Sequence, residues 1–418
     1  MPSCIWHPLS HAPMRWHMMN SSASSHIPKP RNICFISSNQ VWGGSEELWY
    51  RTALTFAKGG HRVSVYKPFI ADSREATVLR GSGCRIHDLA GPRHAPTRLR
   101  KLVSQVWKAS RYLQDRLLAR GLRALQPDLV VVSQGLNYDG WYAGEVCRKL
   151  GIPFVLVSQK ASDLYWPHDR MHAELRGVFG AAQRAFFVSE HNLRLTEEQL
   201  GMALPNGILV RNPYNADWSN PLPWPSAGAE ESVRLACLAR LDAREKGQDL
   251  LLRVLAMPKW RTRDISVQFY GSGHNANGLK GMAAYLGLEN VQFPGYSATP
   301  AKIWETAHGL ILPSRCEGLP LSLVEAMLSG RVAIVTDVAG NREALQDGVS
   351  GFLAESATEA ALDAALERAW QQRGSWPSIG RQAAEAARSL VSPDPVGEFK
   401  AMLEDLIRSD RREKAAKG

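Results

Sequence analysis

The stretch LILPSRCEGLPLSLVEAM, residues 310–327, carries the strongest structural signal in the chain. The apolar run 310–312 is typical of a buried strand that ends at Pro313, and Pro320 suits the first turn of a following helix. A glycine-containing loop between them leaves the first N–H groups of that helix unpaired. Residues Gly318, Leu319, Pro320 and Leu321 therefore form a candidate site for a phosphate or for sugar hydroxyls.

Two glutamates flank this loop and differ in their surroundings. Glu317 lies in the loop itself, whereas Glu325 lies on the helix among Leu323, Val324 and Met327. A glutamate on a helix is usually a solvated surface residue. A carboxylate on a helix otherwise built for burial needs partners, so Glu325 is a candidate acceptor for both hydroxyls of a ribose.

A second strand, loop and helix upstream carry two cations. Arg240 directly follows the apolar run 234–239, and Lys246 directly precedes a helix predicted to begin near Gly247. Both side chains could reach a diphosphate, although a lone cation is usually only a surface charge. Gly271 and Tyr296 follow two further predicted strands, and we expect them on the same rim because parallel strands end at one edge of a sheet.

Strands and helices alternate along most of the chain, which predicts α/β architecture with parallel sheets covered on both faces. The predicted strands cover residues 33–37, 61–66, 129–133, 154–158 and 185–188, and then 234–239, 265–270, 291–293, 309–312 and 332–336. The first strand is followed by Gly43 and Gly44 and by a helix with Ser45 as its N-cap.

A proline-rich stretch without periodicity interrupts this alternation and predicts the domain boundaries. We expect a disordered leader over 1–30, a first α/β domain over 31–212, a linker over 213–232, a second α/β domain over 233–390, and a C-terminal helix and tail over 391–418. Two doubly wound domains of this kind place a ligand cleft between the carboxyl ends of two facing sheets.

Composition excludes several classes of protein. The 418 residues are 44% hydrophobic and 22% charged, which is ordinary globular usage. No apolar run reaches the roughly 18 residues of a membrane span. The six cysteines are scattered without CxxC spacing, so neither a zinc site nor a disulfide framework is expected, and a cytoplasmic location fits best.

The net charge of +10 is concentrated in one segment. Between Arg93 and Arg123 there are nine arginines and lysines against a single acid, Asp115. Leu99, Leu102, Val103, Val106, Leu113 and Leu117 share one face of a predicted helix over 98–123. This helix either packs its stripe on its own domain or rests its basic face on the anionic inner surface of the plasma membrane. No aromatic platform accompanies the charge, so nucleic acid is not an expected partner.

The second half of the chain resembles the retaining glycosyltransferases of family 4, which have two Rossmann-like domains, the GT-B fold. The resemblance rests on Arg240 with Lys246 and Gly247, on Gly271, on Glu317 to Leu321, and on Glu325. It implies that Arg240 and Lys246 hold the donor diphosphate, that Glu325 binds the ribose, and that Glu317 contacts the transferred sugar. In the first domain, Gly43 and Gly44 match the loop that closes near the donor phosphates.

The resemblance implies a metal-independent hexosyltransferase that moves a sugar from a UDP-sugar or GDP-sugar to a glycan or lipid-linked acceptor in cell-surface polysaccharide biosynthesis. No cofactor and no metal ligands are assigned. The sequence departs from the family pattern where many members carry a histidine, since Gln159 or Lys160 takes its place. A nucleotide-sugar epimerase or hydrolase on the same fold, or a catalytically silent glycan-binding relative, are the alternatives.

Overall fold

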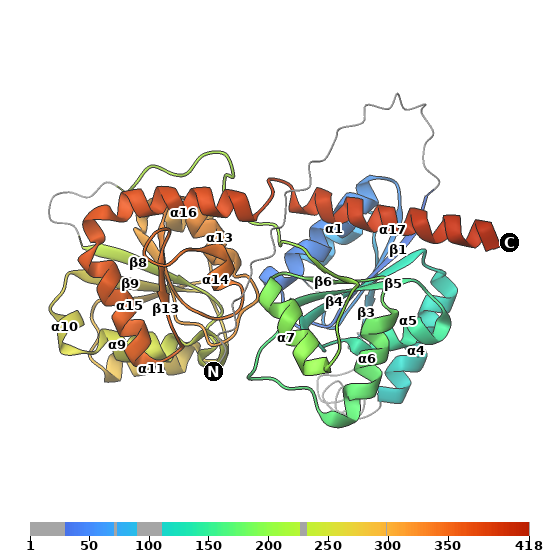
Figure 1. The fold of residues 1–418 in the computed structure, drawn as a ribbon, viewed down its shortest axis with the longest axis horizontal. Coiled ribbons are helices and arrows are strands. Elements are labelled where there is room, and N and C mark those ends of the chain that lie inside the picture. Colours follow the sequence, from blue (N-terminus) through green and yellow to red (C-terminus); the bar gives the residue numbers. More distant parts are fainter. Residues whose placement is uncertain (1–29, 71–72, 90–110, 226–231, 298, 418) are drawn as a thin grey trace, which may run out of the picture. The chain divides into compact units, whose positions relative to one another are not determined.

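The computed structural model describes residues 30–70, 73–89, 111–225, 232–297 and 299–417. Residues 1–29 of the expected leader, residues 98–110 of the predicted basic helix and part of the predicted linker lie outside these ranges. The described residues form two parallel sheets, of seven and six strands, with helices between successive strands (Figure 1). The predicted α/β architecture is confirmed.

The first sheet has the strand order β3-β2-β1-β4-β5-β6-β7. Its strands are β1 (Asn32–Ser37), β2 (Arg62–Lys67), β3 (Arg85–Asp88), β4 (Leu129–Leu136), β5 (Phe154–Lys160), β6 (Arg184–Phe187) and β7 (Gly207–Leu209). Its helices are α1 (Glu47–Lys58), α2 (Arg74–Gly81), α4 (Arg111–Leu125), α5 (Trp141–Leu150), α6 (His172–Ala181) and α7 (Glu190–Leu200). Short 3-10 turns cover Gly44–Glu46 and Asp169–Met171.

The second sheet has the order β10-β9-β8-β11-β12-β13. Its strands are β8 (Val233–Leu238), β9 (Ile265–Tyr270), β10 (Val291–Gly295), β11 (Gly309–Leu312), β12 (Val332–Thr336) and β13 (Phe352–Ala354). Its helices are α8 (Ala243–Lys246), α9 (Gln248–Leu255), α10 (Pro258–Arg261), α11 (Ala276–Tyr285), α12 (Pro300–Thr306), α13 (Leu321–Leu328), α14 (Asn341–Ala344), α15 (Glu359–Gln371) and α16 (Trp376–Leu390), with a 3-10 turn at Arg373–Ser375.

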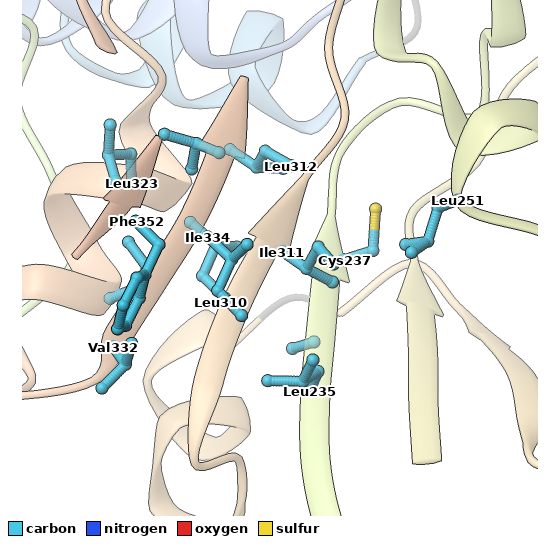
Figure 2. Close-up of a cluster of buried hydrophobic side chains, with 14 of the residues drawn as sticks. Leu235, Cys237, Leu251, Leu310, Ile311, Leu312, Leu323, Val332, Ile334 and Phe352 are labelled. Carbon is cyan, nitrogen blue, oxygen red and sulfur yellow. The ribbon is translucent and has the colours of Figure 1, made fainter. Parts of the chain in front are cut away.

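The core of the second sheet explains why its central strands read as unbroken apolar runs. Leu310, Ile311 and Leu312 of β11 are almost fully buried, because neighbouring strands and covering helices exclude water from both faces. Figure 2 shows these side chains beside those of β8 and β12, with Leu323 of α13 and Leu251 of α9. This packing fixes where β11 ends and therefore where the loop containing Glu317 begins.

The last helix, α17 (Pro395–Lys417), packs on the first sheet rather than on the second (Figure 1). Its Phe399, Leu403 and Ile407 are buried in the cluster that also contains Phe35 and Phe56. Phe399 meets Phe186 edge-on, with ring centroids 5.1 Å apart. The chain thus returns to its first sheet after completing the second.

Three predictions about individual elements were wrong or incomplete. Three short strands, β3, β7 and β13, were not predicted, because segments of three or four residues are too short to show alternation. Ser45 is not an N-cap, since α1 begins at Glu47 after a 3-10 turn, and the Ser45 hydroxyl instead accepts from Asn39. Leu117 was predicted to lie on the apolar stripe of the basic helix, but in α4 it is 44% exposed, and Leu118 and Leu122 form the buried face.

Candidate functional site

Two neighbouring strands bring the predicted site residues together. β8 and β11 are paired in parallel, so the loops that follow them start at the same edge of the second sheet. The loop after β8 carries Arg240 and leads into α8, which ends at Lys246. The loop after β11 carries Glu317 and leads into α13, whose N-cap is Pro320.

Lys246 and Glu317 form a shielded ion pair. The distance from Lys246 Nζ to Glu317 Oε2 is 2.7 Å, and the two side chains are only 15% and 8% exposed. The other carboxylate oxygen of Glu317 accepts from the Ser314 hydroxyl at 2.7 Å. Thr336 donates to the Ser314 carbonyl in turn, so the position of Glu317 is fixed by a chain of hydrogen bonds from β12.

Glu245 is the residue of this site that sequence reasoning missed. Its side chain accepts from Arg240 on one oxygen, and from Lys160 at 2.7 Å and Tyr165 at 3.1 Å on the other. Burial acts to raise its pKa, but Lys160, Arg240 and Lys246 outweigh it and hold the pKa below the usual range. A glutamate on a four-residue helix shows no periodicity, so the sequence offered no signal of its burial.

Lys160 is the last residue of β5 in the first sheet, and Tyr165 lies five residues beyond it. We call these two residues, together with Arg240, Glu245, Lys246 and Glu317, the strand-end cluster. The hydroxyl of Tyr165 remains a donor, because burial and the neighbouring Glu245 raise its pKa to about 12. Of the aromatic residues around β5, Trp141 is buried in the core and Trp166 is 59% exposed.

Two glycines allow backbone from the two sheets to approach closely. A Cβ on Gly318 would lie 2.0 Å from the Gln159 carbonyl oxygen, so no larger residue fits there without movement. A Cβ on Gly44 would lie 2.8 Å from the side chain of Leu321, at the start of α13. The predicted loop of Gly43 and Gly44 thus lies at the N-terminus of the helix that follows Glu317.

A fully buried ion pair lies next to the loop of Gly43 and Gly44 and holds it in place. Lys67 Nζ lies 2.8 Å from Glu46 Oε2, and neither side chain is exposed. Glu46 also accepts from Ser37 and Asn39, and Lys67 lies 5.2 Å from the centre of the Trp42 ring. These contacts hold the segment between β1 and α1 in one arrangement.

Glu325 lies on α13 and is 3% exposed. Its Oε1 accepts from the Asn215 N–H at 2.9 Å. Burial raises the pKa of its carboxyl to about 7, and the Asn215 hydrogen bond acts in the opposite direction. The expectation that this helix buries its glutamate agrees with the structure.

The remaining predicted residues lie at the rim or outside the cluster. Gly271 has φ of +134°, and a Cβ there would lie 2.1 Å from the Ala239 carbonyl, so it packs directly against the loop that carries Arg240. Tyr296 is 78% exposed. Within the same residues, no group of three or more His, Cys, Asp or Glu is arranged to hold a metal ion.

Burial of Glu325 predicts a pH-dependent stability. Its pKa is raised in the folded state, so its contribution to stability is complete below about pH 4.5 and is lost as pH rises to about 7. Glutamine does not ionise, so Glu325→Gln should be free of this loss. Its free energy of unfolding minus that of the parent protein should therefore increase by about 2 to 3 kcal/mol from pH 5 to pH 8. Urea unfolding at both pH values measures this gain. The exposed Glu305→Gln is the control, and equal behaviour of the two variants would contradict the burial of an ionisable Glu325.

Solved structures of known proteins share this fold. The Anabaena protein HepE, solved with UDP and glucose, superposes with a TM-score of 0.68 at 16% identity, over 90% of this chain and 99% of that one. Sucrose-phosphate synthase from Thermosynechococcus elongatus gives a TM-score of 0.68 at 16% identity, over 91% and 100%. The fold is therefore that of the GT-B glycosyltransferases, as predicted.

Two family profiles match the sequence and assign the chain to a family. Residues 232–372 match the profile described as Glycosyl transferases group 1, and residues 42–215 match Glycosyltransferase Family 4. The chain belongs to the glycosyltransferase family that these two profiles describe, group 1 or family 4.

Two curated relatives have lower coverage. The putative glycosyltransferase EpsD of Bacillus subtilis is 25% identical over 41% of this chain and 45% of its own length. The GDP-mannose-dependent alpha-(1-6)-phosphatidylinositol monomannoside mannosyltransferase of Mycolicibacterium smegmatis is 27% identical over 53% and 62%. The chain thus matches less than two thirds of the length of each.

Proposed function

We propose that this chain is a retaining glycosyltransferase that transfers a hexose-type sugar from a UDP-sugar or GDP-sugar to a glycan or lipid-linked acceptor in the biosynthesis of a cell-surface polysaccharide. The observation that carries the proposal is the shielded pair of Lys246 and Glu317 beside Arg240, at the edge where β8 and β11 end. The names of the relatives support a nucleotide-sugar donor, since one was solved with UDP and glucose and another uses GDP-mannose.

The proposed roles follow from charge and position. Departure of a nucleoside diphosphate leaves negative charge on its outer phosphate, and Arg240 and Lys246 are the cations that stabilise it. The N–H groups at the start of α13, around Gly318 to Leu321, add donors at a helix N-terminus. With this charge neutralised by side chains, the proposed reaction requires no metal ion.

The nucleoside and the sugar are assigned to the two glutamates. Glu325 accepts the ribose hydroxyls in place of the Asn215 N–H, or alongside it. Glu317, held by Lys246 and Ser314, contacts the transferred sugar. Gly43, Gly44 and Gly271 are assigned to the backbone that surrounds the donor, and the exposed Tyr296 is assigned to the outer rim.

The proposal is tested by following the donor. We expect the purified protein to release nucleoside diphosphate from one UDP-sugar or GDP-sugar, and a lipid or glycan acceptor to raise the rate. NMR of the product should show the anomeric configuration of the donor. Equal consumption with and without acceptor would indicate the hydrolase or epimerase, and no consumption would support the silent relative.

A membrane surface is the proposed partner of the basic helix. In the described part of α4, Arg116, Arg120 and Arg123 are exposed beside the exposed Leu117, whereas Leu118 and Leu122 face the core. Among the described residues, no helix combines the length and apolar character needed to cross a bilayer. A contact through α4 would therefore be peripheral, with cations on lipid headgroups.

Replacing Arg116, Arg120 and Arg123 by glutamine should weaken binding to phosphatidylserine-containing vesicles by roughly a hundredfold, at about 1 kcal/mol per charge near the surface. Co-sedimentation measures the effect. The matched control replaces three exposed cations on helices of the second sheet, Lys280, Lys302 and Arg381. Equal loss in both triple variants would show that only net charge matters, and no loss in the first would show that α4 is an ordinary solvated face.

A further inference from the structure

Lys160 is the last residue of β5, in the strand end where the sequence departs from the family pattern. Its Nζ lies 2.7 Å from Glu245 Oε1, and its side chain is 19% exposed. Glu245 belongs to α8, on the second sheet. The first sheet therefore contributes a shielded cation to the group of residues that includes Arg240 and Lys246.

The neighbouring residue, Gln159, is buried and contacts Asn212 and Gly318. Its side-chain oxygen accepts from Asn212 at 2.7 Å, and its backbone carbonyl faces Gly318. Its amide nitrogen is buried and has no partner among the described residues. Of these two neighbouring residues, Lys160 is therefore the one whose side chain reaches Glu245 of the second domain.

The Glu245 carboxylate marks a place where an anion is stabilised by both sheets. One of its oxygens accepts from Arg240, and the other accepts from Lys160 and Tyr165. A carboxylate and a phosphate use the same kind of oxygen acceptor, and lysine binds either as a point charge. The donors that hold Glu245 could equally hold two oxygens of a phosphate.

The charges around this position are balanced without a ligand. Four cations, Lys160, Arg240, Arg244 and Lys246, face four carboxylates, those of Asp139, Asp242, Glu245 and Glu317. A nucleoside diphosphate adds at least two negative charges. A diphosphate near Arg240 would compete with the carboxylates for these cations, and Glu245 is the carboxylate that holds both Lys160 and Arg240.

We propose that Lys160 is a ligand of the donor diphosphate, held by Glu245 in the free protein and transferred to the outer phosphate when the donor binds. Resting on the function proposed above, this inference adds a donor-binding residue from the first sheet that takes up charge developing on the leaving group. If Lys160 serves only to join the two sheets, replacing it lowers the free energy of unfolding and leaves the affinity for nucleoside diphosphates unchanged.

The test compares affinities for nucleoside mono- and diphosphates by calorimetry, using UMP with UDP and GMP with GDP. Lys160→Met should weaken diphosphate binding about tenfold or more, while monophosphate binding changes little, so the preference for the diphosphate falls. Lys160→Arg should preserve most of that preference. Glu245→Gln should raise diphosphate affinity, because it removes the competing charge. Lys149→Met, on the exposed end of α5, is the matched control.

The outcomes separate this inference from the proposed function. If the parent protein binds no nucleoside diphosphate, the proposed function fails and the inference fails with it. If the parent protein binds a diphosphate and Lys160→Met binds it equally well, the donor site stands and Lys160 is not a phosphate ligand. Thermal unfolding of each variant confirms that the comparison is made between folded proteins.

Discussion

Glu317→Gln should lower the rate of sugar transfer by about two to three orders of magnitude without weakening donor binding. The glutamine keeps the shape of the side chain and can still accept from Ser314, but it removes the charge that pairs with Lys246 at 2.7 Å. The measurement is kcat and KM with the donor identified by nucleotide binding. The expected loss is in kcat.

Glu325→Gln is the matched comparison, because this second buried glutamate lies eight positions further along the same loop and helix. Its assigned contact is the ribose, so its replacement should raise KM for the donor and have a smaller effect on kcat. If both variants show parental kinetics, neither carboxylate has the role assigned to it. If the two effects are exchanged, the assignments of sugar and ribose are reversed.

Gly247→Ala should have the largest effect on stability. Gly247 has φ of +63°, and a Cβ there would lie 1.9 Å from the Pro313 carbonyl oxygen, in the loop that carries Glu317. The left-handed backbone alone costs roughly 1 to 2 kcal/mol for a residue with a Cβ, and the clash adds to it. We expect a loss on the order of 3 kcal/mol or more in urea unfolding, together with loss of transfer.

Gly60→Ala separates the two causes. Gly60 also has positive φ, +79°, but a Cβ there would have nothing within 4 Å, so only the backbone cost applies. A loss of roughly 1 kcal/mol is expected there. Equal losses at the two positions would show that the loop after β11 moves aside easily and that Lys246 and Glu317 are not rigidly placed.

The central strands of both sheets could be predicted because they are buried on both faces and therefore read as apolar runs. Arg240, Lys246 and Glu317 could be singled out because each follows such a run within a few residues, and Glu325 because it lies among apolar residues on a helix. The edge strands β3, β7 and β13 could not, since segments of three or four residues are too short to show a pattern.

What escaped prediction depends on contacts between distant segments. Glu245 became part of the site only because β5 brings Lys160 and Tyr165 to it, across 85 and 80 positions of sequence. The closeness of Gly318 to the Gln159 carbonyl has the same origin. The fully buried pair of Lys67 and Glu46 was also missed, because both residues are of types that sequence analysis places on the surface.

The measurement that tests the central claim most directly is thermal unfolding of the parent protein and Arg240→Ala with UDP, GDP and their sugars, in the absence of metal. A ligand at about a hundred times its Kd stabilises the folded state by about 2.7 kcal/mol, and the unfolding temperature should rise by roughly a few degrees with one base. The account predicts this rise in the parent protein and its loss in Arg240→Ala. No rise with any nucleotide, or an equal rise in the variant, would contradict it.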